Sequence, residues 1–166
     1  MRGMRISSTC SNVRVSIAGD ATMVISRRAI RVDWGDCDPA GIVFYPNYFR
    51  WFDANTTALF ESAGLSLSAL YRAHGLVGFP ILDTGAKFRG SSRFGDELET
   101  ESSVAEWTEK TLKIEHRFRR AGTLLVEGFE LRVCAVPHPD DASRIKAAPI
   151  PAIVRERLGD ARDRST

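Results

Sequence analysis

The sequence predicts an α+β domain in which an antiparallel sheet curls around one long helix. Apolar residues keep helical spacing from Pro46 to about Ala63 and cover a wide arc of that helix. Farther along, apolar and charged residues alternate between Leu112 and Arg119, which is typical of a strand with one buried face. A lone sheet face could not bury the aromatic side chains of the helix, so we expect the sheet to wrap around it.

The length and composition fit a single globular core. The chain has 166 residues, of which 43% are hydrophobic and 27% are charged, close to the averages for globular domains. Its 23 basic and 21 acidic residues give a formal charge of +2, which provides no general attraction to nucleic acid or to an anionic membrane. No run approaches the roughly 18 apolar residues of a spanning helix. We therefore expect a soluble protein with neither nucleic acid nor membrane as a partner.

The cysteines indicate a reducing compartment, and we expect the cytoplasm. There are three of them, Cys10, Cys37 and Cys134, and their odd number and wide spacing give neither a disulfide framework nor a paired-cysteine zinc motif.

Residues 1–28 are rich in arginine, serine and threonine. They suit either an organellar targeting segment or a disordered extension before a later start site, and Met23, just before the first strand-like run, favours the extension. We therefore expect one domain over residues 29–159, followed by a charged tail over residues 160–166.

The first elements of that domain follow from alternation and from turn residues. Residues 29–34 alternate as a strand that ends at Gly35, and residues 35–48 form a loop. Within this loop, residues 38–41 (Asp-Pro-Ala-Gly) have the side chains of a type I turn. Pro46 suits the first position of the long helix, and Gly64 ends it.

The later elements are a short helix and a run of strands. Residues 97–104 alternate with an acidic solvent face, and Ala121-Gly122 is a turn between two strands of an antiparallel meander. The expected segments are a helix over 66–74, strands over 80–89, 97–104, 112–119 and 124–136, an edge segment over 144–148 and a helical turn over 153–158.

Familiar catalytic motifs are absent from the sequence. It contains no GxSxG, P-loop, GxGxxG or HExxH motif. His74, His116 and His138 lack the spacing of metal ligands, and His116 shares the apolar face of its strand, so it is expected to be a core histidine with satisfied hydrogen bonds. The acids on both sides of Cys37 disfavour a nucleophilic thiolate.

Asp38 and the start of the long helix are the two features of the sequence that point to a possible catalytic site. If Pro46 is the first helical residue, Tyr45 occupies the capping position, which usually holds a serine, threonine, aspartate or asparagine. The first amides of the helix are then partly without acceptors and can polarise a carbonyl oxygen, while Asp38 acts as nucleophile or general base. The alternative is that Asp38 only begins a turn and that Asp36 caps a nearby amide.

The segment GDCDPAGIVFYPNYFRWFDA, from Gly35 to Ala54, resembles the 4-hydroxybenzoyl-CoA thioesterase family of hotdog-fold acyl-CoA thioesterases. The motifs GDCDPAGIV and YPNY fall in the family's order and spacing. The resemblance continues more loosely through GLVGFPI at Gly75 to Ile81 and through Glu106, Trp107 and Lys110, and it covers about residues 30–149.

The resemblance implies roles for particular residues. Asp38 matches the family's catalytic carboxylate, and Tyr45 matches the residue whose backbone amide points at the thioester carbonyl. Gly41, in the same motif, is implied as a substrate-binding residue. The family needs no metal or redox cofactor, and its members form homodimers with one continuous sheet, commonly paired into homotetramers, with active sites at the subunit interface.

Two departures from the family bear on the substrate. Where the 4-hydroxybenzoyl enzyme has a basic cluster for the coenzyme A phosphates, only Lys110 keeps a charge here; Arg117 or Arg119 could substitute, or could lie on a solvated face with the glutamates of the neighbouring strand. Phe79 replaces a polar side chain, which suits an unsubstituted aryl group or an aliphatic chain. Asp53 either contacts the end of the substrate or makes a structural hydrogen bond.

The expected function is hydrolysis of a small aryl-CoA thioester, of the benzoyl-CoA or hydroxybenzoyl-CoA type, to the free acid and coenzyme A, within aromatic compound metabolism. The alternatives are a short-chain aliphatic acyl-CoA thioesterase and a non-catalytic hotdog protein that binds acyl-CoA. Nucleic-acid binding through the arginine-rich N-terminus lacks aromatic residues between the basic ones.

Overall fold

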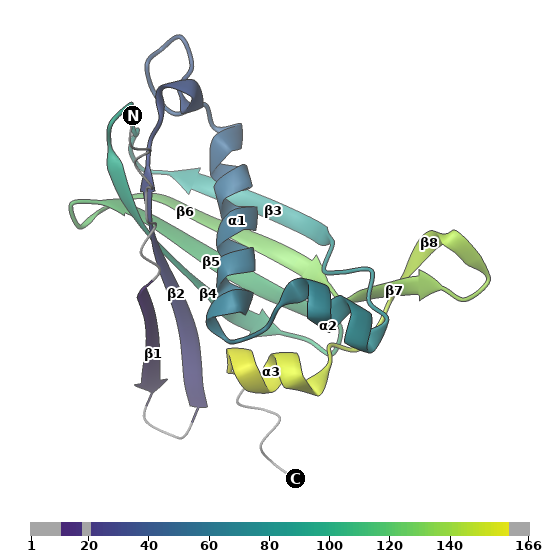
Figure 1. Ribbon diagram of the computed structural model, residues 1–166. Coiled ribbons are helices and arrows are strands. Elements are labelled where there is room, and N and C mark those ends of the chain that lie inside the picture. The colour runs from purple at the N-terminus through teal and green to yellow at the C-terminus, as the bar shows by residue number, and fades with distance from the viewer. Residues whose placement is uncertain (1–10, 18–20, 160–166) are drawn as a thin grey trace, which may run out of the picture.

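The computed structural model describes residues 11–17 and 21–159, and it has the predicted α+β architecture, with helix α1 against an antiparallel sheet (Figure 1). The elements are β1 (Ser11–Ile17), β2 (Ala21–Arg31), a 3-10 helix (Trp34–Asp36), α1 (Pro46–Ser62), α2 (Leu67–His74), β3 (Ile81–Phe88), β4 (Glu97–Trp107), β5 (Thr111–Arg120), β6 (Thr123–Val133), β7 (Ala135–His138), β8 (Asp141–Ala147) and α3 (Ala152–Leu158).

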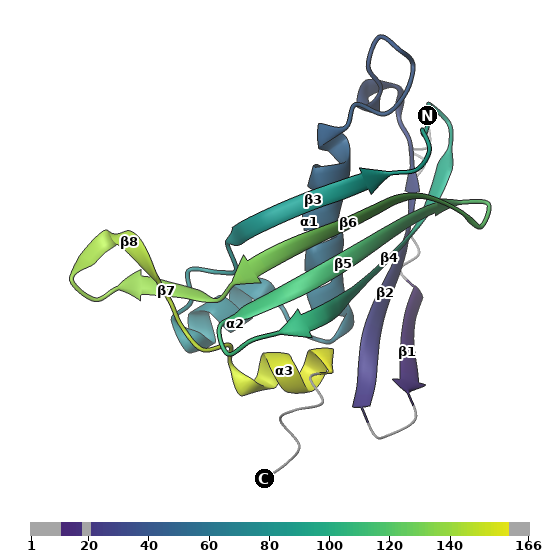
Figure 2. The ribbon, with the colours of Figure 1, turned by 180° about the vertical axis from the view of Figure 1, so that it is seen from behind.

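The main sheet has six strands in the order β1-β2-β4-β5-β6-β3. Strands β4, β5 and β6 form the predicted meander, whereas β3 pairs with β6 and so lies at the edge of the sheet. Helix α1 crosses one face of this sheet, and Figure 2 shows that none of the helices of the described residues covers the other face. Strands β7 and β8 form a separate hairpin that projects from the body.

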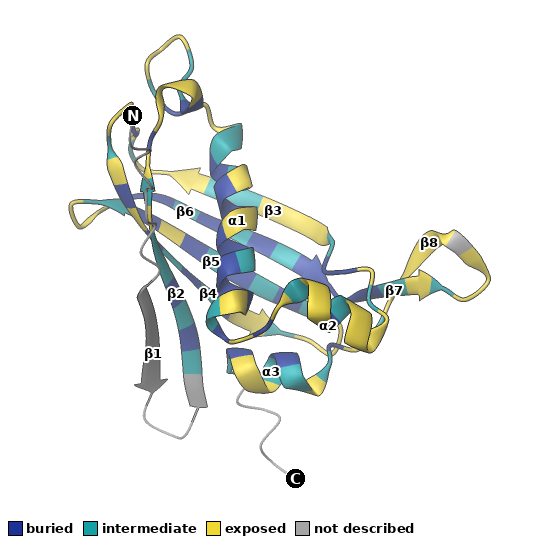
Figure 3. Cartoon of the chain, in the orientation of Figure 1, coloured by how far each residue is buried: buried dark blue, intermediate teal, exposed yellow. Residues whose placement is uncertain are grey.

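Helix α1 has the bounds expected from Pro46 and Gly64 and buries the predicted arc. Tyr48, Trp51, Phe52, Asn55 and Leu59 are buried, and so is Phe60 on the adjacent face. The burial colours of Figure 3 show the resulting stripe along the helix. Apolar burial on this scale, rather than helix propensity alone, stabilises the helix in place.

The burial of β5 confirms the prediction made from the clearest alternation in the sequence. Leu112, Ile114, His116 and Phe118 are buried against α1, while the residues between them face outward. Its turn into β6 contains Ala121 and Gly122, with φ values of 46° and 78°. Two successive positive φ angles match the right-handed twist of the flanking strands in a two-residue hairpin.

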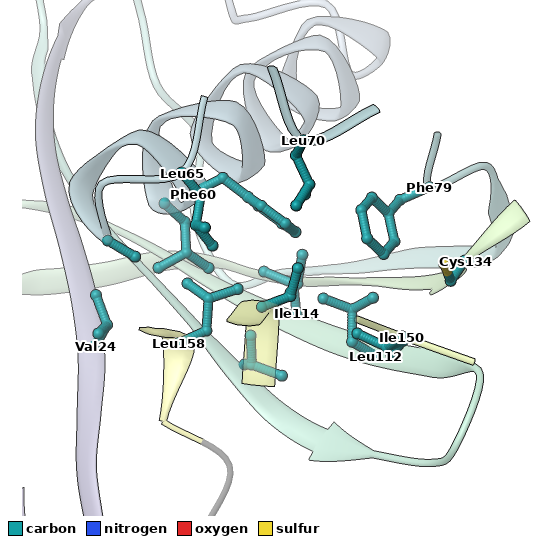
Figure 4. Packing of buried hydrophobic residues seen from close by; sticks show 14 residues of the cluster. Val24, Phe60, Leu65, Leu70, Phe79, Leu112, Ile114, Cys134, Ile150 and Leu158 are labelled. Atoms are coloured by element: carbon teal, nitrogen blue, oxygen red, sulfur yellow. The ribbon is translucent and has the colours of Figure 1, made fainter. Parts of the chain in front are cut away.

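The core has two parts along α1. Around the second half of the helix, Phe60, Leu112 and Ile114 pack with residues of α2 and α3 (Figure 4). Around the first half, aromatic side chains dominate, and Phe52 contacts Phe118 edge to face. The aromatic part lies directly below the loop that precedes α1 and gives that loop a rigid base.

The N-terminal region differs from the sequence prediction. Strand β2 begins at Ala21 rather than Ala29, because the alternation that buries Val24 and Ser26 starts earlier than predicted. Strand β1 pairs with it antiparallel, Ser11 opposite Arg27. Both segments belonged to the predicted extension over residues 1–28. Residues 1–10 and 18–20, with the predicted tail over 160–166, lie outside the described residues.

Smaller differences concern two predicted strands. Strand β2 ends at Arg31, and Trp34–Asp36 forms a 3-10 turn instead of continuing to Gly35. The predicted edge segment over 144–148 is part of β8, which pairs with β7 and not with the main sheet.

Candidate functional site

Asp36 fixes the loop between β2 and α1. Its carboxylate accepts hydrogen bonds from the backbone N–H of Asp33 (2.9 Å) and from Nη2 of Arg50 (2.6 Å). Its carbonyl oxygen accepts from the N–H of Phe44 and from Nδ2 of Asn47, both at 2.9 Å. Asp36 therefore ties the loop to the first turns of α1. In the sequence analysis, Asp36 was named as the cap of a nearby amide within the alternative interpretation, and Asp38 was named as the reactive acid.

Asp38 begins the predicted turn. The N–H of Gly41 donates to the carbonyl oxygen of Asp38 (2.9 Å), which closes the turn, and the N–H of Ala40 donates to Oδ1 of Asp38 (2.8 Å). The positive φ of Gly41, 73°, favours glycine. The side chain of Asp38 is half-buried. Among the hydrogen bonds of the described residues, only Oδ1 of this carboxylate is used, so Oδ2 is open for chemistry.

Tyr45 caps α1 without a side-chain hydrogen bond, as predicted. The N–H of Asn47 donates to the carbonyl of Phe44 (2.9 Å), and the N–H of Tyr48 donates to that of Tyr45 (3.1 Å). The amides inside the first turn are thus satisfied. Within the described part of the chain, the N–H of Tyr45 makes no hydrogen bond, so it is the donor left open where the helix dipole is positive.

The turn and the helix start can together perform acyl chemistry. A carbonyl oxygen bound to the Tyr45 amide would be polarised, and the oxyanion formed on attack would be stabilised by the same donor. Asp38 precedes that amide by one short loop and supplies a carboxylate as nucleophile or base.

A second polar group lies deeper, between α1 and β6. Arg132 donates from Nη2 to Oδ1 of Asp53 (2.6 Å) and to Oε1 of Glu130 (2.8 Å), and from Nε to Oε2 of Glu130 (3.1 Å). Glu130 is 1% exposed. Burial would raise the pKa of its carboxyl, but hydrogen bonds from His116, Arg132 and Thr56 hold that pKa at about 2.

His116 completes this buried group. It is fully buried, stacks on the ring of Phe52, lies 2.8 Å from Oγ of Ser102 through Nδ1 and lies 3.4 Å from Glu130 through Nε2. Burial lowers the pKa of the imidazole, so it is neutral near pH 7 and donates from Nε2 to Glu130. The prediction of a satisfied core histidine is confirmed.

Sequence reasoning missed Glu130 and Arg132. Both occupy the inward phase of β6, two residues apart, after the buried Val126 and Gly128. Two opposite charges in the apolar phase of a strand are a signal for a buried ion pair, and that signal was available in the sequence.

Phe79 lies in the hydrophobic core (Figure 4), and its ring contacts those of Phe60 and Tyr71. Its carbonyl oxygen accepts a hydrogen bond from Nη1 of Arg132 (3.2 Å). The structure therefore brings Phe79 and Asp53 together through Arg132. Asp53 lies seven residues into α1, about 10 Å along the axis from the helix start.

The two predicted phosphate-binding residues lie elsewhere in the protomer. Lys110 is exposed in the turn between β4 and β5, and its carbonyl accepts from the N–H of Cys134. This turn lies beside α3, at the end of the molecule opposite the start of α1 (Figure 1). Arg117 lies on the outward face of β5, bonded to Glu115 (3.1 Å) and opposite Glu101 and Glu127 in the neighbouring strands. The structure does not bring either residue to Asp38 within one chain.

Two further observations limit the kinds of site available. Among the described residues, no group of three or more histidine, cysteine, aspartate or glutamate side chains could hold a metal ion. In the same part of the chain, every helix is too short or too polar to cross a membrane.

Known proteins share both the sequence pattern and the fold. Residues 32–158 match the thioesterase-like superfamily. The chain is 35% identical to 4-hydroxybenzoyl-CoA thioesterase from Pseudomonas sp. (strain CBS-3) over 128 residues, which are 74% of this chain and 89% of that protein.

Solved structures of thioesterases are also similar to this chain. A mutant of 4-hydroxybenzoyl CoA thioesterase with an aspartate changed to asparagine, complexed with 4-hydroxybenzoyl CoA, aligns with a TM-score of 0.75 and 33% identity over 81% of this chain and 99% of that one. A gentisyl-coenzyme A thioesterase aligns with a TM-score of 0.69 and 32% identity over 80% and 99%.

The fold and the named relatives together identify a hotdog-fold thioester hydrolase. The chain belongs to the thioesterase-like superfamily, and its resemblance to the 4-hydroxybenzoyl-CoA thioesterases, first seen in the GDCDPAG motif, is confirmed over most of its length.

Proposed function

We propose that this protein hydrolyses a small aryl-CoA thioester, of the benzoyl or hydroxybenzoyl type, to the free acid and coenzyme A. The observation that carries the proposal is the half-buried Asp38 carboxylate, with Oδ2 open, one loop before the unpaired amide of Tyr45. Relatives that act on 4-hydroxybenzoyl-CoA and gentisyl-coenzyme A, both aryl thioesters, support it.

The reaction follows from these two groups. The thioester carbonyl accepts a hydrogen bond from the Tyr45 amide. In one course, Asp38 attacks the carbonyl carbon, the C–S bond breaks, coenzyme A leaves as the thiolate, and water then hydrolyses the acyl anhydride. In the other, Asp38 takes a proton from a water molecule as its oxygen attacks the carbonyl carbon, the C–S bond of the tetrahedral intermediate then breaks, and the departing coenzyme A thiolate receives the proton. In both courses the products are one carboxylic acid and one thiol.

The acyl group would extend from Tyr45 along α1 toward Asp53 and Phe79. A substituted aryl acyl group, together with a hydrogen bond at each of its ends, fits the distance of about 10 Å along the helix axis. The ring of Phe79 is buried in the core behind that end, and its apolar character also favours the alternative substrate, a short aliphatic acyl chain. Gly41, in the reactive turn, leaves space for the thioester because it has no side chain.

We also propose a homodimer that joins two sheets at β3, and a tetramer of two such dimers. Strand β3 is at the edge of the sheet and exposes Ile81, Leu82 and Phe88. An exposed apolar edge favours pairing with a second chain. Lys110 and Arg117 lie away from Asp38 in one protomer, so in this arrangement they would meet the coenzyme A phosphates of a site shared with the partner.

The test is thiol release from benzoyl-CoA, 4-hydroxybenzoyl-CoA and a short aliphatic series. With Asp38→Asn we expect at least a hundredfold loss of turnover, because the amide keeps the shape of the carboxylate but neither attacks nor accepts the proton. Asp140→Asn, in the exposed turn between β7 and β8, is the matched control and should keep normal turnover.

Near-normal turnover in a folded Asp38→Asn protein would overturn this mechanism. If every ester is inert while acyl-CoA still binds, the protein is the non-catalytic binder of the alternative hypothesis. Turnover confined to the aliphatic esters would replace the aryl substrate with the aliphatic one.

A further inference from the structure

The loop between β3 and β4, residues 89–96, is fastened to the loop that carries Asp38. The N–H of Val43 donates to the carbonyl oxygen of Ser92 (2.8 Å), and Oη of Tyr48 donates to Oγ of Ser92 (3.0 Å). Ser92 is itself buried. Ser92 therefore connects the two loops at the start of α1.

Asp96 fixes the backbone of Arg93, the residue after Ser92. The N–H of Arg93 donates to Oδ2 of Asp96 (2.8 Å), and the N–H of Asp96 donates to the carbonyl oxygen of Arg93 (3.0 Å). Nη1 of Arg120, on β5, donates to the same Oδ2 (2.6 Å). The side chain of Arg93 thus extends from a backbone that is held in place.

The guanidinium of Arg93 lies against the turn that begins at Asp38. Its Nη1 is 3.7 Å from the position that a Cβ would take at Gly41, and apart from the chain neighbours of Gly41 no other heavy atom of the described residues is within 4 Å of that position. Arg93 is exposed, and within the described ranges, 11–17 and 21–159, its guanidinium donates no hydrogen bond and forms no ion pair. The space that Gly41 leaves for the thioester is therefore bordered by a cation without a partner among those residues.

In the proposed reaction, one developing charge has no partner in the residues named so far. Negative charge passes to the carbonyl oxygen, where the Tyr45 amide donates, and then to sulfur as the C–S bond breaks. A thiol has a pKa of about 8.5, and a nearby cation favours its thiolate. Arg93 suits that position because a guanidinium keeps its proton and offers several N–H donors. In the described part of the chain no ion pair joins Arg93 to Asp38, so the charge of that carboxylate stays available for the reaction.

We propose that Arg93 is a catalytic residue: its guanidinium donates a hydrogen bond to the thioester sulfur and stabilises the coenzyme A thiolate as it departs. The electron pair of the C–S bond passes to sulfur, the guanidinium keeps its proton, and the thiolate is protonated afterwards. This inference rests on the proposed function, because it takes the thioester to lie between Asp38 and the Tyr45 amide. It gives the leaving group a partner in the β3–β4 loop.

Single-turnover kinetics test this role, with the CoA ester that the unchanged protein hydrolyses fastest. Arg93→Gln removes the charge and should slow thiol release by at least about tenfold, less than the loss of an oxyanion donor because Arg93 is exposed and partly screened by water. The Kd of the same ester, measured by calorimetry in an Asp38→Asn background, should change by less than about twofold, since the sulfur carries no charge before the bond breaks.

Two further variants separate the charge of Arg93 from its packing. Arg93→Lys keeps a cation near the same place and should retain more of the rate than Arg93→Gln. Arg89→Gln, in the same loop, is the matched control. Arg89 is exposed and pairs with Glu127 (2.7 Å), and its replacement should leave the rate unchanged.

The dependence on the leaving group separates a catalytic role from mere support of the turn. Esters of the same acid with thiophenol and with a nitro-substituted thiophenol release thiolates that are progressively more stable. The rate lost in Arg93→Gln should therefore decrease from the CoA ester to the thiophenyl ester, and further to the nitrophenyl ester. A residue that only supported the turn would cost each ester the same factor.

Three results would overturn the proposal: an unchanged single-turnover rate in folded Arg93→Gln, an equal loss for all three esters, or a loss confined to Kd. The last result would instead place Arg93 on a phosphate of coenzyme A. Arg93→Gln would then bind the S-acyl pantetheine ester, which has no phosphate, as well as the unchanged protein does. Failure of the proposed function appears separately, as the absence of Asp38-dependent thiol release in the otherwise unchanged protein.

Discussion

At Gly128, α1 packs against β6 with no space for a side chain. A Cβ at this position would lie 2.1 Å from Cζ of Phe52 and 2.4 Å from its Cε2. Phe52 is itself fully buried between the stacked ring of His116 and the ring of Phe118. The phenyl ring of Phe52 therefore cannot move away to make room for a Cβ at Gly128.

We expect Gly128→Ala to lower the free energy of unfolding by about 3 kcal/mol, the upper part of the range for an overpacked core. Gly35→Ala is the control, since a Cβ there meets no atom within 4 Å, and its effect should stay within about 0.5 kcal/mol. Urea denaturation of both variants gives the comparison. Equal stabilities would show that β6 shifts to admit the methyl group.

Single residues were predictable from the sequence where their role is local. The turn at Asp38 follows from four consecutive residues, and the core position of His116 follows from alternation along one strand. The contact between Glu130 and Thr56 was not predictable, because Thr56 is 74 positions away in the chain. Alternation indicates which side of a strand a residue faces, but not which side chain it meets there.

At the level of elements, the start of α1 combines an open amide with a proline that follows it. Tyr45 has φ −51°, which a proline can adopt. Its side chain is exposed, so the backbone donor can be removed while the helix is kept.

We expect Tyr45→Pro to reduce turnover by roughly a hundredfold to a thousandfold, the usual effect of removing one oxyanion donor. Tyr45→Ala keeps the amide and should retain most of the activity. Steady-state thiol release measures both, with circular dichroism to verify the helix. If the two variants lose activity to the same degree, the side chain of Tyr45, and not its amide, serves the reaction.

Strand β3 allows a test of assembly. Leu82 is exposed on this edge strand, and a carboxylate there should disfavour burial against a second chain. Light scattering after size exclusion should show a dimer or larger species for the unchanged protein and a smaller one for Leu82→Asp. Ile145→Asp, at another exposed position, in the projecting hairpin, should keep the original mass. A protein that is monomeric without any substitution would exclude the β3 dimer.

Elements with strong periodicity were predicted well, and those that depend on pairing were not. Helix α1 and strand β5 each show a strong periodicity of apolar residues, so their predicted bounds were nearly correct. The early part of β2 was missed because it was assigned to the arginine-rich and serine-rich segment over residues 1–28, although Val24 and Ser26 are buried. That β3 pairs with β6 depends on the whole sheet, and no local pattern encodes it.

At the scale of the whole molecule, the buried His116 and Glu130 make stability depend on pH. Burial lowers the pKa of His116 in the folded protein, whereas in the unfolded chain it is about 6.5. Below that value the unfolded chain binds a proton that the folded protein does not, so acid favours unfolding. Glu130, with a folded pKa of about 2 against an ordinary 4.5, adds a further loss as the pH falls from about 4.5 toward 2.

We therefore expect the free energy of unfolding to decrease as the pH is lowered from 7.5 to about 5, and to decrease more steeply below about 4.5. Urea denaturation at several pH values measures this. His116→Gln should flatten the upper part of the profile, and His74→Gln, at an exposed position, should leave it unchanged. A profile that is flat above pH 5 in the unchanged protein would contradict the assignment of a neutral, buried imidazole.

The strand order β1-β2-β4-β5-β6-β3 also dictates the sequence of events during synthesis. Strand β3 leaves the ribosome before β4, β5 and β6, yet its only partner in the sheet of the described chain is β6. Helix α1 likewise emerges before the strands that cover its aromatic stripe. Until translation passes Val133, the nascent chain carries an uncovered apolar helix and an unpaired strand, a state in which chains aggregate or recruit chaperones. Because of this strand order, the nascent chain needs chaperones to prevent aggregation until β6, the last strand of the main sheet, has been synthesised.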